Sequence, residues 1–167
     1  MARPQSTRRR PPGRGRAPGA YTLIEVVLVL AIAAVVAGVA VPRFGNATAR
    51  YRADTAARRI CADLAQAQAY AKYTGSTQTV TFAPTAKTYQ VSGVSDLSRS
   101  GRTYQVDLAD APYRATAVSA SFGGSAAVSF DAYGNPSPAS TGTVTVRVGT
   151  VTRTVTMDAT SGRATWQ

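Results

Sequence analysis

The chain has 167 residues, enough for one domain and an appendage, and its 19 Lys/Arg against 8 Asp/Glu give a formal net charge of +11. It contains no histidine and a single cysteine, Cys61. The commonest general base and zinc ligand are therefore missing, and no intrachain disulfide can form.

Residues 1–20 form a basic leader. They carry six of the 19 basic residues and no acid, which leaves 13 basic against 8 acidic residues, a net of +5, in the remainder. Arginine, proline and glycine dominate the leader, and it has too few apolar side chains to fold. Because much of the charge lies in this tail, the overall charge is weak evidence for nucleic-acid binding.

Residues 21–41 are apolar apart from Thr22 and Glu25. As a helix this segment would be about 32 Å long, which is sufficient to cross a bilayer. The preceding arginines would keep the leader in the cytoplasm and send the C-terminal part out. A conventional signal peptide is the alternative, but Pro42-Arg43-Phe44 stands where its cleavage site and polar mature start would be expected.

Helical periodicity continues beyond this segment, with apolar residues at spacings of three and four up to a stop at Gly75. This stripe consists of Ala53, Ala57, Ile60, Leu64, Ala67 and Ala71. The residues predicted to lie off the stripe are Arg50, Arg52, Arg58, Arg59 and Asp63. One helix is thus expected from near Thr22 to Thr74, apolar all round in its first half, amphipathic in its second, and bent at Pro42. We expect Cys61 to be buried, and Tyr51, Tyr70 and Tyr73 to pack on a sheet.

The stretch "AYTLIEVVLVLAIAAVVAGVAVPRF" (20–44) resembles the N-terminal segment of type IV pilins and pseudopilins. The resemblance implies cleavage by prepilin peptidase and N-methylation of the new first residue. The family usually has Gly before the cut and Phe after it, whereas here Ala20 precedes Tyr21 and Gly19 lies one place earlier. A cut after Gly19 would make Glu25 the sixth mature residue. We place the cut between Ala20 and Tyr21, because this register makes Glu25 the fifth mature residue and Pro42 the twenty-second, which are the family's positions.

Glu25 is a carboxylate within an apolar segment. Unpaired in a membrane it would cost about 2.5–3.5 kcal/mol, so such residues are usually functional. The resemblance implies that Glu25 pairs with the N-terminal amine of a neighbouring subunit during filament assembly. The alternative is a carboxylate stabilised at a helix N-terminus, with its head reaching the lipid headgroups.

The remainder of the chain reads as antiparallel β-structure. Strands are expected at 77–83, 87–93, 103–108, 126–130, 143–148 and 152–157, with a short one in "RATWQ" (163–167). Turns are expected at Pro84-Thr85 and Gly149-Thr150, and 93–102 is expected to be a loop. The expected fold class is α+β and pilin-like, with one long N-terminal helix packed on a two-sheet antiparallel domain. The expected parts are the leader (1–20), the transmembrane half of the helix (21–41), its amphipathic half (42–74) and the β domain (75–167).

The C-terminal part is similar to GspH/FimT-type pseudopilins in its Phe-x-x-x-Gly turn, its two threonine-rich strands and its Ser-Gly-Arg. Some FimT-like pilins bind DNA through a Gly-Arg-x-Arg motif. Here Gly162-Arg163 is followed by Ala164-Thr165, so the second arginine is missing. A patch of Arg147, Arg153 and Arg163 could still contact DNA non-specifically, but scattered surface arginines are the favoured interpretation.

Other chemistry finds little support. Asp107, Asp110 and Asp131 are too few for a calcium loop, so no metal site is expected. No Gly-x-Ser-x-Gly elbow and no P-loop occur, so we expect neither an enzyme nor a cofactor, and filament extension must be powered by another protein.

These patterns indicate a minor pseudopilin, a structural subunit of a type II secretion system. Its expected partners are prepilin peptidase, other pilins or pseudopilins in a filament, and indirectly the inner-membrane assembly platform and its ATPase. The expected location is the bacterial inner membrane, in a single pass with the β domain outside the cytoplasm. The alternatives are a minor pilin of a type IV pilus, with or without DNA binding, and an uncleaved membrane-anchored binding module.

Overall fold

The computed structural model describes residues 21–96 and 101–167, and for residues 39–44 it describes the backbone alone. The chain forms two compact units, Met1–Ala40 and Val41–Gln167. The expected leader and Ala20 lie outside the described residues.

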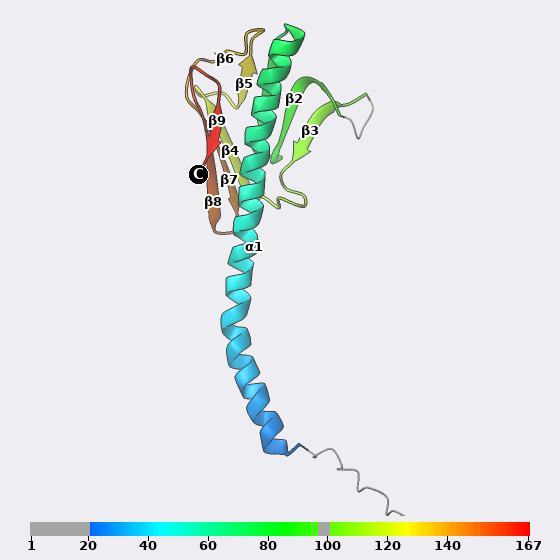
Figure 1. Ribbon diagram of the computed structural model, residues 1–167, viewed down its shortest axis with the longest axis vertical. Helices are drawn as coiled ribbons and strands as arrows, with labels where there is room; N and C mark the ends of the chain where they lie inside the picture. The colour runs from blue at the N-terminus through cyan, green and yellow to red at the C-terminus, as the bar shows by residue number, and fades with distance from the viewer. Residues whose placement is uncertain (1–20, 97–100) are drawn as a thin grey trace, which may run out of the picture. The chain divides into compact units, whose positions relative to one another are not determined.

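One helix, α1, runs from Leu23 to Thr74, as the periodicity predicted (Figure 1). It ends at Gly75, which has a φ of +62°. The Ser76 N–H donates to the carbonyl oxygen of Ala71 at 3.3 Å, which is the long hydrogen bond of a Schellman cap. Glycine adopts this left-handed conformation without steric cost, so the expected stop is confirmed.

The helical backbone continues through Pro42. The bend expected there stays a prediction. Among the residues that are described, no helix is apolar over a stretch long enough to cross a membrane.

The β domain contains two antiparallel sheets, as expected. The first has the strand order β3-β2-β1-β5-β6. Its strands are β1 (Gln78–Ala83), β2 (Thr88–Ser95), β3 (Thr103–Asp107), β5 (Ala127–Phe130) and β6 (Pro136–Ser137). The second sheet has the order β4-β7-β8-β9. Its strands are β4 (Ala117–Phe122), β7 (Gly142–Val148), β8 (Val151–Met157) and β9 (Ala164–Trp166).

Both predicted turns are present. The β1–β2 hairpin pairs Ala83 with Thr88, and the Lys87 N–H closes the turn on the Pro84 carbonyl at 3.2 Å. The β7–β8 hairpin pairs Val148 with Val151, so Gly149 and Thr150 alone connect the strands. In Figure 1, strands β4, β7, β8 and β9 lie to one side of the second half of α1, and β2 and β3 lie to the other.

The core forms between this half of α1 and the two sheets. All six residues of the predicted stripe are at most 1% exposed. Four of the six are alanines, and such small side chains let a helix approach its neighbours closely. The strands supply the large side chains, which include the fully buried Tyr89, Phe122 and Phe130. The amphipathic interpretation of this half of the helix is therefore confirmed.

Several details of the sequence interpretation are wrong. Strand β4 was not predicted, because its alternating Ala and Ser residues have weak strand preference. The two-residue strand β6 was also missed, and β2 extends to Ser95 into the expected loop. Tyr51 and Tyr73 are 69% and 86% exposed instead of packed on a sheet.

Candidate functional site

The N-terminal end of α1 is fixed by Thr22. Its side-chain Oγ1 accepts a hydrogen bond from the Glu25 N–H at 3.3 Å, and its carbonyl oxygen accepts from the N–H groups of Glu25 and Val26 at 3.1 and 3.2 Å. Thr-x-x-Glu is the sequence of a capping box, which starts a helix by satisfying its first free N–H groups. Glu25 is thereby fixed in the first turn of α1.

The turns that follow carry a continuous sleeve of exposed apolar side chains. The exposed fractions range from 47% for Val26 to 82% for Leu23. The other members of the sleeve are Ile24, Val27, Leu28, Val29, Leu30, Ile32, Val35 and Val36. A helix that is apolar on every face needs lipid or other helices around it.

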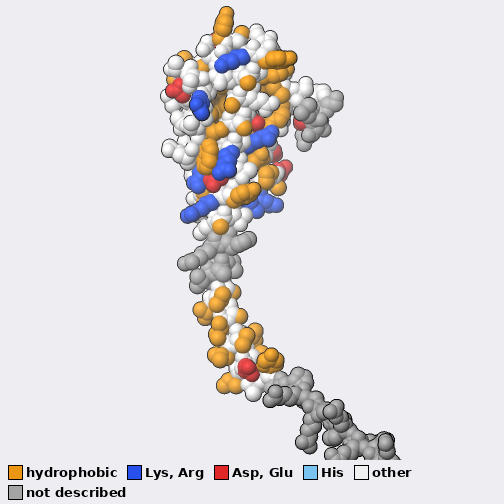
Figure 2. Space-filling view, in the orientation of Figure 1, with side chains coloured by type: hydrophobic (Ala, Val, Ile, Leu, Met, Phe, Trp, Pro, Cys, Tyr) orange, Lys and Arg blue, Asp and Glu red, His pale blue; other side chains and the backbone are white. Residues whose placement is uncertain are grey.

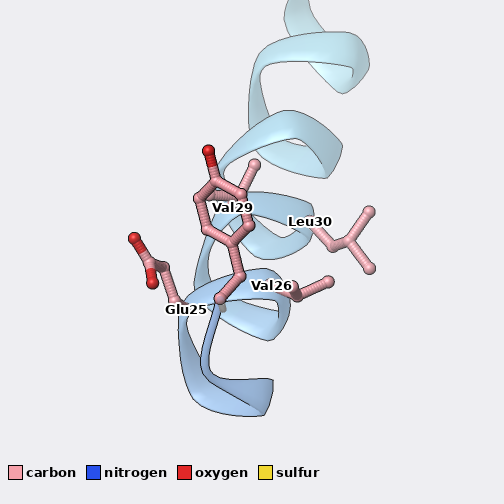
Figure 3. A pocket seen from close by; sticks show the side chains of 5 residues that line it. Glu25, Val26, Val29 and Leu30 are labelled. Carbon is pink, nitrogen blue, oxygen red and sulfur yellow. The ribbon is translucent and has the colours of Figure 1, made fainter. Parts of the chain in front are cut away.

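Glu25 is the acid of this sleeve. A shallow open hollow of about 280 Å³ is lined by Tyr21, Glu25, Val26, Val29 and Leu30. In Figure 3, the Glu25 carboxylate projects to one side of the helix, while Val26 and Leu30 project to the other. A carboxylate bordered by apolar side chains can bind a cationic group strongly once a partner excludes water, because Coulomb attraction grows as the dielectric falls.

Tyr21 precedes the helix and its side chain is 79% exposed. An exposed residue before a helix is accessible to a peptidase and to a methyltransferase. The cleavage and methylation assigned to Tyr21 stay predictions, as does the role of Ala20.

A second cluster of polar residues joins α1 to the first sheet. Asp63 of α1 is only 4% exposed. Its Oδ2 accepts hydrogen bonds from the hydroxyl of Tyr89 at 2.5 Å and from that of Tyr104 at 2.9 Å. The same oxygen pairs with Arg59 Nε at 3.1 Å, and the Arg59 guanidinium also donates to the Tyr104 hydroxyl.

The prediction that Asp63 lies off the buried stripe is wrong. Asp63 lies three residues after Ile60 and four before Ala67, so its spacing belongs to the buried stripe. Its charge made it seem a surface residue. The sequence signal for its burial was the helical spacing of Asp63 together with Tyr89 and Tyr104 in the predicted strands. A buried carboxylate needs hydrogen-bond donors, and the two tyrosine hydroxyls can supply them.

The pKa values of three groups in this cluster are raised above their ordinary values. The hydrogen bond with Tyr104 raises the pKa of the Arg59 guanidinium above its ordinary value. Burial raises the pKa of the Tyr89 hydroxyl, and the nearby charge of Asp63 raises it further. Burial also raises the pKa of the Tyr104 hydroxyl, although its hydrogen bond with Arg59 opposes this. Both tyrosines therefore remain donors at neutral pH, and the cluster acts as a fixed connection.

Another helix residue, Gln68, joins the two turns on which the C-terminal resemblance depended. Its side-chain Nε2 donates to the carbonyl oxygens of Gly134 at 2.8 Å and of Ser161 at 2.7 Å. A Cβ on Gly162 would lie 2.9 Å from this nitrogen and 3.0 Å from Phe130 Cε1, and Gly162 has a φ of +67°. The Phe-x-x-x-Gly and Ser-Gly-Arg turns are thus both fixed on α1.

The three arginines suggested for DNA contact do not form one patch. Arg147 pairs in register with Ala117 and Thr152, whereas Arg153 pairs with Val146. Because side chains alternate along a strand and direct partners share a face, Arg147 and Arg153 lie on opposite faces of the sheet. Arg153 Nε binds Asp54 Oδ1 at 2.6 Å. Arg163 lies beyond the other end of β8, where its carbonyl accepts from the Asp158 N–H.

Cys61 is half-buried, less than expected, and burial raises the pKa of its thiol. Within residues 21–96 and 101–167, no three His, Cys, Asp or Glu side chains come together as metal ligands.

The family described as type II transport protein GspH matches residues 56–161. The chain belongs to the GspH family. The match covers α1 from Ala56 onward, most of the core and the Phe-x-x-x-Gly turn, and it ends at Ser161, the first residue of the Ser-Gly-Arg turn. Members of this family are pilin-like structural subunits, and assembly with other pilins in a filament follows from that membership. No curated protein sequence matches the chain significantly.

Two crystal structures of the type IV minor pilin FimU from Pseudomonas aeruginosa PAO1 resemble this GspH-family chain. The form in space group P21 has a TM-score of 0.53 and 17% identity, and the similarity covers 71% of this chain and 90% of FimU. The form in space group P65 has a TM-score of 0.51 and 14% identity, and covers 68% and 91%. At this identity the likeness shows the fold, and it confirms the predicted pilin-like α+β class.

Proposed function

We propose that the protein is a minor pseudopilin, a non-enzymatic subunit of the filament of a type II secretion system. The observation that carries the proposal is Glu25, held in the first turn of a helix whose neighbouring side chains are exposed and apolar. Membership of the GspH family supports the same function.

The proposed sequence of events begins at the inner membrane. Residues 21–41 anchor the precursor there, with the leader in the cytoplasm. Prepilin peptidase removes residues 1–20 and the amine of Tyr21 is methylated. The assembly platform and its ATPase then move the subunit into the filament, where the apolar sleeve packs against sister helices.

Glu25 has a specific role in this scheme. Once lipid or sister helices surround the sleeve, the carboxylate needs a cation, and the amine of a neighbour's Tyr21 is a suitable one. The pair would align an incoming subunit in register with the helices already present. In an apolar setting, the attraction between these two charges is strong enough to favour one helix register over shifted registers.

The test compares Glu25→Ala, Glu25→Gln and Val29→Ala in the full chain. Val29→Ala is the matched control, because it alters the same hollow without removing a charge. We expect both Glu25 variants to insert and to be cleaved, but to crosslink to partner pilins at a small fraction of the wild-type level. Val29→Ala should crosslink normally.

Normal crosslinking of both Glu25 variants would overturn the pairing role and leave Glu25 as a capping residue. Restoration of protein secretion in a strain lacking the gene supports the secretion system. Restoration of surface pili instead would identify a type IV pilus, and an uncleaved precursor that functions normally would indicate an anchored binding module.

A further inference from the structure

The charges of the β domain are distributed unevenly between its two ends. Strands β1, β3 and β7 all run toward the end at which Asp54 of α1 binds Arg153 of β8. We call this the Asp54 end, and the opposite one, where α1 terminates, the Gly75 end. Backbone hydrogen bonds connect the loops of the Asp54 end, since Lys87 pairs with Leu108 and Thr116 with Arg147.

The Asp54 end is basic. It carries six described cations: Arg50, Arg52, Lys87, Arg114, Arg147 and Arg153. It carries three acids: Asp54, Asp107 and Asp110. One of these acids is already paired with Arg153, and none of the other five cations forms an ion pair with a residue that the structure describes.

The Gly75 end is balanced. Its described cations are Lys72, Arg102 and Arg163, and its acids are Asp96, Asp131 and Asp158. Figure 2 shows more Lys and Arg side chains over the half of the domain nearer the Asp54 end than over the other half. Charge that served only to keep the domain soluble would not need to collect at one end.

The Asp54 end is also the end at which the chain enters the domain. Among the side chains of α1 that the structure describes, Ala53 is the first buried one, and Arg50 and Arg52 lie three residues and one residue before it. Arg50 is nine residues after Val41, or about 14 Å of helix. If residues 21–41 lie in a membrane, this basic end is the part of the domain that the anchor keeps close to the lipid headgroups.

We propose that the Asp54 end binds the anionic headgroups of the membrane leaflet that faces the β domain. This inference rests on the anchoring included in the proposed function. Basic side chains near an anionic membrane each bind favourably, and the anchor keeps their effective concentration high. An unassembled subunit would thus rest with its basic end on the membrane, and entry into the filament would have to release it.

The chain supplies its own reporter. Trp166, its single tryptophan, lies on β9, whose direction is toward the Asp54 end. We would insert the full chain into vesicles that contain dansyl-labelled headgroups and measure energy transfer from Trp166. One set of vesicles is neutral phosphatidylcholine, and the other contains about 30 mol% phosphatidylglycerol to supply anionic charge.

The test variant is Arg50→Gln/Arg52→Gln/Arg147→Gln, which removes three cations without breaking an ion pair that the structure records. The matched control is Lys72→Gln/Arg102→Gln/Arg163→Gln, with equal loss of charge at the Gly75 end. We expect transfer to be higher in the anionic vesicles for wild type and control. Each arginine removed from the Asp54 end should lower the ratio of docked to free domains about fivefold. Transfer should also fall at about 1 M salt, where the Debye length is about 3 Å.

Equal transfer in both kinds of vesicle, or equal loss in both triple variants, would overturn the inference. The inference would also be overturned if the protein bound a short DNA duplex through the same three arginines and the energy transfer did not depend on the lipid charge. Flotation with neutral vesicles is a separate readout. Failure to float would remove the proposed anchoring itself, whereas flotation without a charge effect would overturn this inference alone.

Discussion

The hydroxyl of Tyr89 on β2 donates to the buried carboxylate of Asp63 on α1 at 2.5 Å. This contact connects the long helix to β2, the second strand of the first sheet. Arg59 and Tyr104 complete the cluster, so both strands of the β2–β3 hairpin are connected to one oxygen. The stability of the domain should therefore depend on Asp63 more than on any exposed acid.

Asp63→Ala should lower the free energy of unfolding by about 2–4 kcal/mol, because it leaves the Tyr89 hydroxyl buried without an acceptor. Asp54→Ala is the matched control, since Asp54 is another helix acid with an ion pair but is 29% exposed. It should cost about 1 kcal/mol or less. Urea unfolding of the full chain in detergent, followed by circular dichroism, measures both. Equal losses would show that burial of the cluster contributes nothing.

The raised pKa of Tyr89 makes stability depend on alkaline pH. Below pH 10, the ordinary value, the phenol is protonated in both the folded and the unfolded chain, and the stabilisation is fully present. Above pH 10 the unfolded chain ionises first, so stability falls by up to about 1.4 kcal/mol per pH unit for this group. Denaturant midpoints from pH 8 to 11 measure the fall, and Tyr89→Phe should make it shallower. The same slope in both proteins would assign it to other groups.

Gln68→Ala should destabilise the domain by about 1–3 kcal/mol, because two carbonyl groups lose their common donor. Gln66→Ala, an exposed neighbour on the same helix, should have an effect near zero. Hydrogen exchange should report faster opening of the segments 131–135 and 158–163 in the Gln68 variant alone. Unchanged hydrogen exchange in these two segments would mean that the turns are stable without Gln68.

Coexpression with a prepilin peptidase should yield a chain that begins at Tyr21, as read by mass spectrometry of the intact protein. Ala20→Gly should preserve the cut, because glycine is smaller still, whereas Ala20→Leu should block it. A product that begins at Ala20 would support the register after Gly19. A cut beyond Val41 would support a conventional signal peptide.

The helix, its end and most of the strands were predictable because each depends on neighbours in sequence. Gly75 ends α1 through a local cap, and Gly149-Thr150 sets a two-residue hairpin. Asp63 was misassigned because its donors come from strands 26 and 41 residues later. Gln68 was overlooked for the same reason, since the carbonyls that it binds lie 66 and 93 residues away. The start of α1 near Thr22 was predictable because the contacts that begin the helix lie within a single turn. The role of Glu25 came from the family resemblance and stays a prediction.

The core closes only when the last long strand is in place. Ala57 and Ile60 of the α1 stripe belong to the same buried cluster as Val155 and Met157 of β8. Contacts so distant in sequence form late, after the intervening chain has been ordered. If the N-terminal part of the chain crosses a membrane first, the β domain follows it as an unfolded polypeptide. Because the core includes residues of β8, the domain can fold only after nearly all of the chain has crossed. During that interval the exposed Ala-rich face of the helix would need a chaperone or the membrane surface to cover it.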